Sequence, residues 1–233
     1  MLLFVSVPLV VGLTAISEWP WLLPISSGGA AWAWLRTRRG SSTLRTTGVL
    51  LLWASLLSLS IVLLTILCPE RAASSISHST VYWHEMSEYL RSGAGKEGTP
   101  SRFIPEHLVH LFAFVVLALG TGGLAALILG AYLLGYMSYY VGQVALHAEH
   151  PLIAGALAWH PWALLRIIAF VLMGVVLARP LLERRSPLAI MRIEKKALGF
   201  ALGLWGADLI LKAAIAPAWS SIIRSWGGLL LEH

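Results

Sequence analysis

The chain has 233 residues, of which 58% are hydrophobic and 12% are charged, and its formal net charge at pH 7 is +6. A soluble domain carries roughly 25% charged residues, so this composition excludes an ordinary soluble protein. Apolar runs of about 20 residues recur, which is the length that crosses a hydrocarbon core of roughly 30 Å. The positive charge is concentrated in two short loops, which membrane topology explains better than nucleic-acid binding. We therefore expect an all-α polytopic transmembrane helix bundle with no nucleic-acid partner.

The first 35 residues predict either a hairpin of two short helices or a single helix with a re-entrant segment. Residues 2–16 are apolar and have no basic segment before them, which argues against a cleaved signal peptide. Further spans are expected at residues 50–68, 103–119, 124–146, 161–178 and 197–216, which gives six or seven membrane helices. We expect one domain over residues 1–230, followed at 231–233 by what looks like the remnant of an expression tag.

The two basic loops set the expected orientation. One covers residues 36–45, with four arginines and no acid, and the other covers residues 184–196, with five basic residues and one glutamate. The positive-inside rule puts both loops in the cytoplasm of a bacterial or archaeal cell and residues 69–102 outside its cytoplasmic membrane. Within that outer loop, Trp83, Met86 and Leu90 recur at helical spacing. This predicts an amphipathic surface helix at about residues 80–91, followed by a flexible connector at 92–100.

Histidine is the commonest metal ligand, and seven of the eight histidines are expected on the outer side: His78, His84, His107, His110, His147, His150 and His160. His107, His110 and His160, with Glu106 and His147 as further ligands, are candidates for a transition-metal or haem site in the outer leaflet. Tyr139, Tyr140 and Gln143 are expected beside His107, because they lie at a similar distance from the intervening glycine turn. The alternative, which we favour, is that these side chains are ordinary residents of the membrane interface.

Three charged residues lie inside expected spans, where ionisable groups are candidates for functional sites. Asp208 and Lys212 are four residues apart on one helix, and Arg166 lies on another. We expect Asp208 to be ionised and paired with Lys212, with Arg166 or with both. The group either fixes helix packing or forms part of a polar path.

Residues 103–219 resemble the integral membrane family of stage II sporulation protein M. The resemblance rests on Gly120-Thr121-Gly122, on the segment from Leu129 to Gly135, on His160 before a hydrophobic helix, and on the ending Ala213-Ala214-Ile215-Ala216-Pro217. The family tends to place a glutamate soon after that histidine, in a His-Gly context, whereas here Pro161 follows and the charged residue is Arg166. The resemblance implies a membrane scaffold, whose namesake works with cell-wall hydrolases, and carries over only His160 as a shared polar position.

Three classes of function remain open. The first expectation is a non-enzymatic scaffold or accessory subunit of a membrane complex, with the lipid bilayer and other membrane proteins, or further copies of this chain, as partners. The second is a small transporter or channel that uses Arg166, Asp208 and Lys212. The third is a metal- or haem-binding enzyme. The chain contains no Walker A loop and no G-x-S-x-G motif that would indicate another enzyme class.

Overall fold

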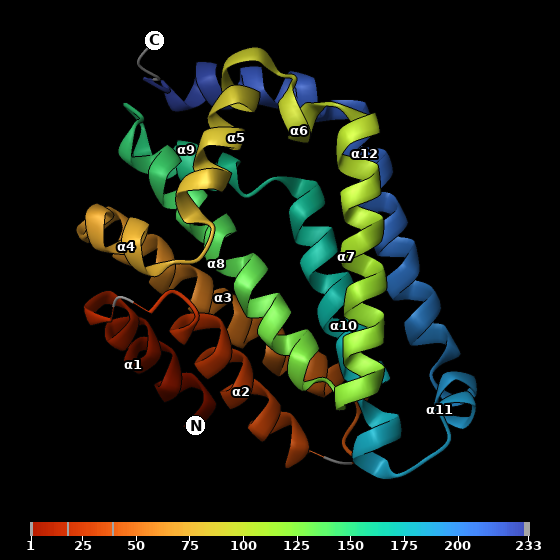
Figure 1. Ribbon diagram of the computed structural model, residues 1–233. Coiled ribbons are helices and arrows are strands. Elements are labelled where there is room, and N and C mark those ends of the chain that lie inside the picture. Colours follow the sequence, from red (N-terminus) through yellow and green to blue (C-terminus); the bar gives the residue numbers. More distant parts are fainter. Residues whose placement is uncertain (1, 18, 39, 231–233) are drawn as a thin grey trace.

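The computed structural model describes residues 2–17, 19–38 and 40–230, and this part of the chain is helical and contains no strand (Figure 1). The expected tag remnant at 231–233 lies outside the described residues. The helices, in chain order, are α1 (Leu2–Ile16), α2 (Leu22–Arg36), α3 (Thr43–Leu67), α4 (Pro69–Ser75), α5 (Ser79–Ser92), α6 (Gly95–Gly98), α7 (Pro100–Thr121), α8 (Leu124–Leu146), α9 (Pro151–Ala158), α10 (Pro161–Glu183), α11 (Pro187–Ile193) and α12 (Lys195–Gly227).

Among the described residues, five helices are long and apolar enough to cross a membrane, namely α3, α7, α8, α10 and α12. The expected multi-pass helical architecture is therefore confirmed. The helices α1 and α2 have 15 residues each, which is about 22 Å at 1.5 Å per residue and shorter than a hydrocarbon core. They pack against each other as a hairpin, with α1 also against α3 and α2 along α8.

The turn between α7 and α8 depends on two glycines. Gly122 and Gly123 both have positive φ angles, 59° and 89°, which cost L side chains energy and glycine very little. A Cβ on Gly123 would also lie 2.9 Å from the Cβ of Ala178 on α10. The predicted antiparallel hairpin about residues 120–123 is confirmed, and it presses closely against α10.

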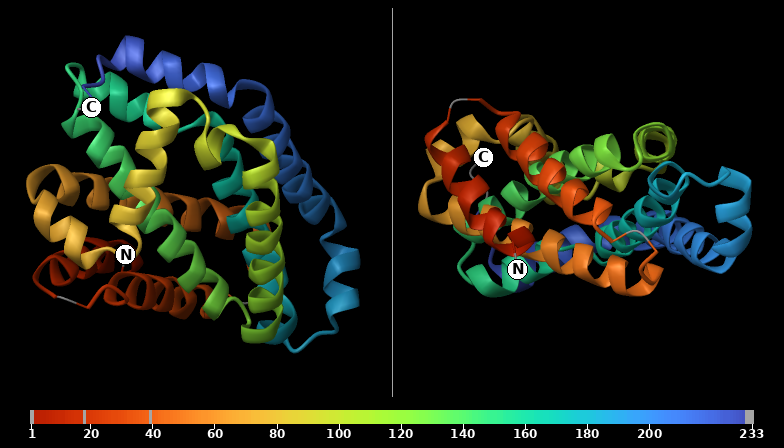
Figure 2. Two further views of the ribbon diagram at one scale, coloured as in Figure 1. Left: turned by 45° about the horizontal axis from the view of Figure 1, so that its top comes forward. Right: turned by 90° about the horizontal axis from the view of Figure 1, so that it is seen from below.

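The final helix is longer than the sequence suggests. We expected a span ending at Ala216, because Pro217 follows, but α12 continues through this proline to Gly227. Figures 1 and 2 show that α12 bends and that its last part lies across one end of the bundle. Proline lacks the N–H that would close one helical hydrogen bond, so it permits a bend without ending the helix. The hydroxyl of Tyr89 on α5 donates a hydrogen bond to the carbonyl of Ala216 (2.6 Å), which holds α5 against the bend.

The outer-loop segment is an integral part of the bundle. Its helix α5 lies where a surface helix was expected, but the apolar side with Met86 and Leu90 is buried and packs on α8 and α12. The expectation of a flexible connector at residues 92–100 is wrong, because α6 lies there and contacts α7 and α12. We call the end of the bundle that carries α5, α6, α9 and the last part of α12 the capped end.

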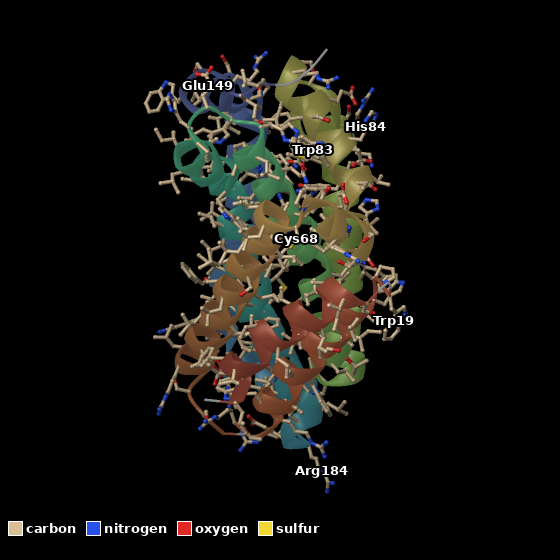
Figure 3. The ribbon with its side chains drawn as sticks, turned by 90° about the vertical axis from the view of Figure 1, so that its left-hand side faces the viewer. Trp19, Cys68, Trp83, His84, Glu149 and Arg184 are labelled. Atoms are coloured by element: carbon tan, nitrogen blue, oxygen red, sulfur yellow. The ribbon has the colours of Figure 1, made fainter. Side chains whose placement is uncertain are left out.

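The two basic loops lie together at the opposite end, which we call the basic end. The guanidinium of Arg179, near the end of α10, contacts both Thr43 at the start of α3 and Glu194 directly before α12. Figure 3 shows the same separation, with Arg184 at one end of the molecule and His84 and Glu149 at the other. Both loops can therefore face the same compartment, as the positive-inside rule requires.

Candidate functional site

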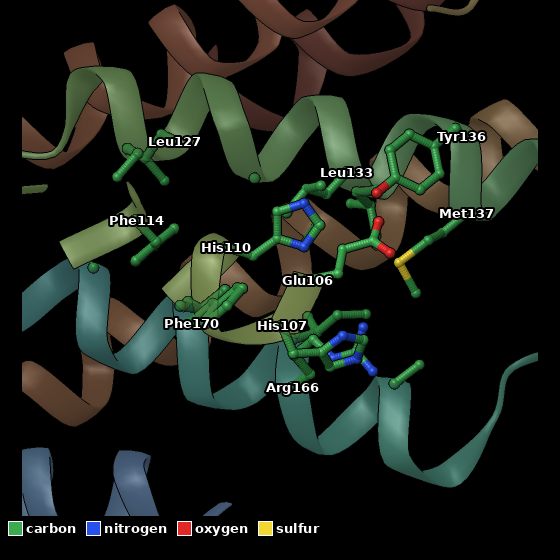
Figure 4. A pocket seen from close by; sticks show the side chains of 18 of the residues that line it. Glu106, His107, His110, Phe114, Leu127, Leu133, Tyr136, Met137, Arg166 and Phe170 are labelled. Carbon is green, nitrogen blue, oxygen red and sulfur yellow. The ribbon is translucent and has the colours of Figure 1, made fainter. Parts of the chain in front are cut away.

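A cavity of about 100 Å³ lies between α7, α8 and α10 (Figure 4). Its lining has two chemically different ends. The end nearer the capped end is polar and comprises Tyr82, Glu97, Glu106, His107, His110, Tyr136 and Arg166. The other end is apolar and includes Phe114, Leu127, Leu134, Phe170 and Val171. Trp53 of α3 also lines the cavity.

Helical periodicity explains this separation of polar and apolar residues. On α7, Glu106, His107 and His110 share a face, and Phe114 continues this face one turn deeper. Figure 4 shows Glu106 and His110 pointing from α7 toward α8, with His107 beside Arg166 of α10. Glu106 is exposed and His110 is partly exposed, so the polar end reaches the molecular surface between α7 and α8.

The prediction that Tyr139, Tyr140 and Gln143 are the neighbours of His107 is wrong. The α8 side chains that line the cavity there are Leu133, Tyr136 and Met137, which lie at similar depth. Tyr136 and Tyr140 are four residues apart and share a helix face. The expected neighbours therefore lie about one helical turn too close to the capped end.

Arg166 and Asp208 form a two-pronged ion pair between α10 and α12. The guanidinium Nε donates to one carboxylate oxygen of Asp208 and Nη2 donates to the other, both at 2.9 Å. The side chain of Asp208 is 0% exposed and that of Arg166 is 16% exposed. This fork geometry is the strongest form of an arginine–carboxylate contact. Arg166 was one of the two expected partners of Asp208.

Lys212, the other expected partner, pairs with Glu97 of α6 instead. Its Nζ lies 2.6 Å from Glu97 Oε2, and the side chain is 0% exposed. The same ammonium lies 4.3 Å from the centre of the Phe103 ring and 3.4 Å from Nε2 of His107. Burial by itself raises the pKa of Glu97, but the nearby charges of Lys212 and Arg166 outweigh this effect and lower the pKa to about 2. Glu97 is therefore ionised at neutral pH.

Sequence reasoning missed Glu97, because it lies in a glycine-rich segment that was read as a solvated connector. One signal could have pointed to it. The expected spans contain two cations, Arg166 and Lys212, and two acids, Asp208 and Glu106, of which Glu106 lies near the start of its span. Since an uncompensated charge in the membrane is costly, Asp208 could satisfy only one of the cations, and a further carboxylate was required for the other.

The proposed metal ligands are only partly brought together. Glu106, His107 and His110 line the cavity, whereas His147 and His160 do not. His147 contacts the carbonyl of Gln143 and stacks on Trp83, with ring centres 5.4 Å apart. Within the described ranges, no group of three or more His, Cys, Asp or Glu side chains is close enough to hold a metal ion. The candidate site on His107, His110 and His160 therefore does not assemble in the described part of the chain.

His160 has an aromatic environment instead. It stands at the N-cap of α10, before Pro161 as expected. Its ring stacks on Trp162 at 4.6 Å, and Nε2 lies 3.4 Å from the hydroxyl of Tyr140. Burial lowers the pKa of His160 to about 3, so the imidazole is neutral.

Several buried side-chain atoms have no hydrogen-bond partner in the described part of the protein, and two of them, both ring nitrogens, belong to residues that line the cavity. They are the Nδ1 of His107, a side chain that is 5% exposed, and the Nε1 of Trp53, which is 3% exposed. Both side chains line the cavity, one from α7 and one from α3.

Comparison with known proteins assigns this chain to no family. No family model matches the chain, and neither curated proteins nor solved structures give a significant match. The resemblance to the stage II sporulation protein M family is not tested by these comparisons and stays a prediction.

Proposed function

We propose that this protein binds an amphiphilic molecule, with a polar head and an apolar chain, from one leaflet of the membrane. The observation that carries the proposal is the division of the cavity into a polar end and an apolar end. Such a site orients an amphiphile, because the head is stabilised by polar groups and the chain by apolar side chains. The role we propose is that of an accessory subunit of a membrane complex, as expected from the sequence. The cavity adds a ligand-binding site to this role.

The position of the opening supports entry from the bilayer. The cavity reaches the surface between α7 and α8, two helices long enough to span a membrane, at the exposed Glu106. A molecule that leaves this gap would enter lipid rather than water. The polar residues lie toward the capped end, so the head would stand near one membrane surface and the chain would point toward the middle of the bilayer.

The charges favour binding over conduction. A polar path would need groups that exchange partners, but Asp208 is held by Arg166 at 2.9 Å and Lys212 by Glu97 at 2.6 Å. These closed pairs fix α10, α12 and α6 around the polar end of the cavity. The basic residues at the other end support a cytoplasmic position for that end, with the polar end of the cavity in the outer leaflet of the cytoplasmic membrane. With α1 and α2 as short membrane helices, the bundle would contain seven.

The test uses the protein in phosphatidylcholine nanodiscs with a trace of a long-chain alcohol, a neutral amphiphile, that carries a photoactivatable diazirine in its chain. After illumination, mass spectrometry locates the cross-links. We expect them to concentrate on cavity residues of the apolar end, such as Leu127 and Phe170. An even distribution over all lipid-facing side chains would overturn the proposal.

A matched pair of variants separates cavity binding from lipid contact. Gly130 lines the cavity, and a Cβ added there meets nothing within 4 Å, so Gly130→Leu would fill the space without a backbone clash. Gly199 on α12 is exposed and equally free of close neighbours. Gly130→Leu should remove most cavity cross-links, whereas Gly199→Leu should leave them unchanged.

A further inference from the structure

The hydrogen-bond donors in the cavity restrict the chemistry of the head. Lys212 is paired with a carboxylate at 2.6 Å and is therefore charged, with three donors and no acceptor. Its ammonium approaches Nε2 of His107 at 3.4 Å, so this nitrogen faces a donor and takes the acceptor role. The ring proton of a neutral imidazole then sits on Nδ1. His107 therefore offers an N–H donor that has no partner within the described residues.

Trp53 also requires a hydrogen-bond acceptor on the ligand. An indole Nε1–H can only donate, and in Trp53 this group is also buried and without a partner in the described structure. A buried donor left unpaired is unfavourable, and two residues with such donors line one cavity. A ligand that fits this cavity supplies acceptor oxygens to both, from α7 on one side and α3 on the other.

The charge balance argues against an anionic head. Both cations near the polar end are compensated, Arg166 by Asp208 and Lys212 by Glu97. Glu106, at the opening, has no ion-pair partner among the residues that the structure describes. A phosphate or carboxylate head would meet this carboxylate without gaining an unpaired cation, so a neutral head is favoured.

The size and the lining of the cavity favour a ring. An enclosed cavity of about 150 Å³ holds one benzene molecule, whereas this cavity is smaller, about 100 Å³, but open on one side. It can therefore hold a single ring only if part of the ring lies in the opening with its chain outside, and the head of a phospholipid is too large for it. Tyr82, Tyr136 and Phe114 supply aromatic surface for such a ring.

We infer that the head group bound here is a neutral ring with carbonyl acceptors on opposite sides, which is the chemistry of a membrane quinone, held by His107 Nδ1–H and Trp53 Nε1–H. This inference rests on the proposed function and names its ligand class. It concerns binding and assigns no electron transfer to the protein.

The test is a competition against the diazirine alcohol in the same nanodiscs. Decylubiquinone and decylbenzene share a ring and a ten-carbon chain, but only the quinone carries acceptors. We expect decylubiquinone to compete about tenfold more strongly, which corresponds to about 1.4 kcal/mol, a typical gain from satisfying a buried donor. Equal competition by the two compounds would overturn the inference but leave the proposed function standing.

Two substitutions at one position identify the donor. In His107→Asn the amide nitrogen takes the place of Nδ1, so the quinone preference should be retained. In His107→Gln the amide oxygen takes the place of Nε2 toward Lys212, and the donor at Nδ1 is lost. We expect this variant, like Trp53→Phe, to lose most of the preference for decylubiquinone over decylbenzene. Retention of the full preference in both would refute the assignment.

The remaining outcomes separate the two proposals. If decyl phosphate competes better than decylubiquinone, the head is anionic and the inference is wrong, although amphiphile binding holds. If the photoactivatable alcohol never labels the cavity in the wild-type protein, the proposed function itself fails. The comparison of ligands on the wild-type protein does not depend on the folding of any variant.

Discussion

Removal of the charge of Asp208 should destabilise the protein strongly, because it leaves a buried arginine without its carboxylate. Asp208→Asn keeps the shape of the side chain but turns an amide NH₂ or a single oxygen toward two guanidinium N–H groups. Breaking a buried ion pair typically costs about 3–5 kcal/mol. The 16% exposure of Arg166 gives the guanidinium some access to solvent, so we expect the lower part of this range, about 3 kcal/mol.

Thermal unfolding in detergent measures this effect. For a chain of this length, about 3 kcal/mol corresponds to a decrease in Tm of roughly 6–12 °C. Arg166→Met should cost a similar amount. The double variant should be more stable than the sum of the two losses predicts, by up to about 3 kcal/mol, because the first substitution already removes the contact. Lys196→Gln, which removes an exposed charge from the same helix, should change stability by less than about 0.5 kcal/mol.

Additive losses in the Arg166 and Asp208 variants would refute the ion pair. A second cycle, with Asp208→Asn and Lys212→Met, checks how the charges are paired. Since Lys212 contacts Glu97 rather than Asp208, its coupling to Asp208 should be clearly weaker than that of Arg166. Equal coupling in the two cycles would show that the pairing described here is wrong.

Three further predictions concern the pair of Glu97 and Lys212, the close contact between α8 and α3, and the orientation of the protein in the membrane. The pKa of Glu97 is lowered from its usual 4.5 to about 2, so its pair with Lys212 should stabilise the fold fully above pH 4.5 and lose this contribution as the pH falls toward 2. Unfolding measured across this pH range should show the loss of stability in the wild type and not in Glu97→Gln. Gly142→Ala should cost about 1–3 kcal/mol in detergent unfolding, because its Cβ would lie 2.6 Å from Thr65 on α3, whereas Gly130→Ala on the same helix should be neutral or slightly stabilising. In a protein with Cys68 replaced by serine, the variant His84→Cys should react with an impermeant maleimide added outside intact cells, and the variant Ser186→Cys should not. Reaction of Ser186→Cys would show that the orientation is the reverse.

The sequence by itself determined the class of the protein and much of its helical plan. Composition and the length of the apolar runs require membrane helices, because only helices satisfy their own backbone hydrogen bonds in lipid. Gly122 and Gly123 marked a turn, since consecutive positive φ angles exclude other residues. The isolated charges at Arg166, Asp208 and Lys212 marked positions that had to find partners.

The tertiary structure alone decided which residues meet. Counting residues from the glycine turn gives only an approximate depth, because the tilt of each helix depends on all of its neighbours at once. The sequence therefore placed Tyr139 and Tyr140 level with His107, whereas Tyr136, about one turn deeper, lines the cavity with it. The role of Glu97 could not be predicted for a related reason. Its place beside Lys212 depends on how α6 folds back onto α12, a contact across about half of the chain that no local pattern encodes.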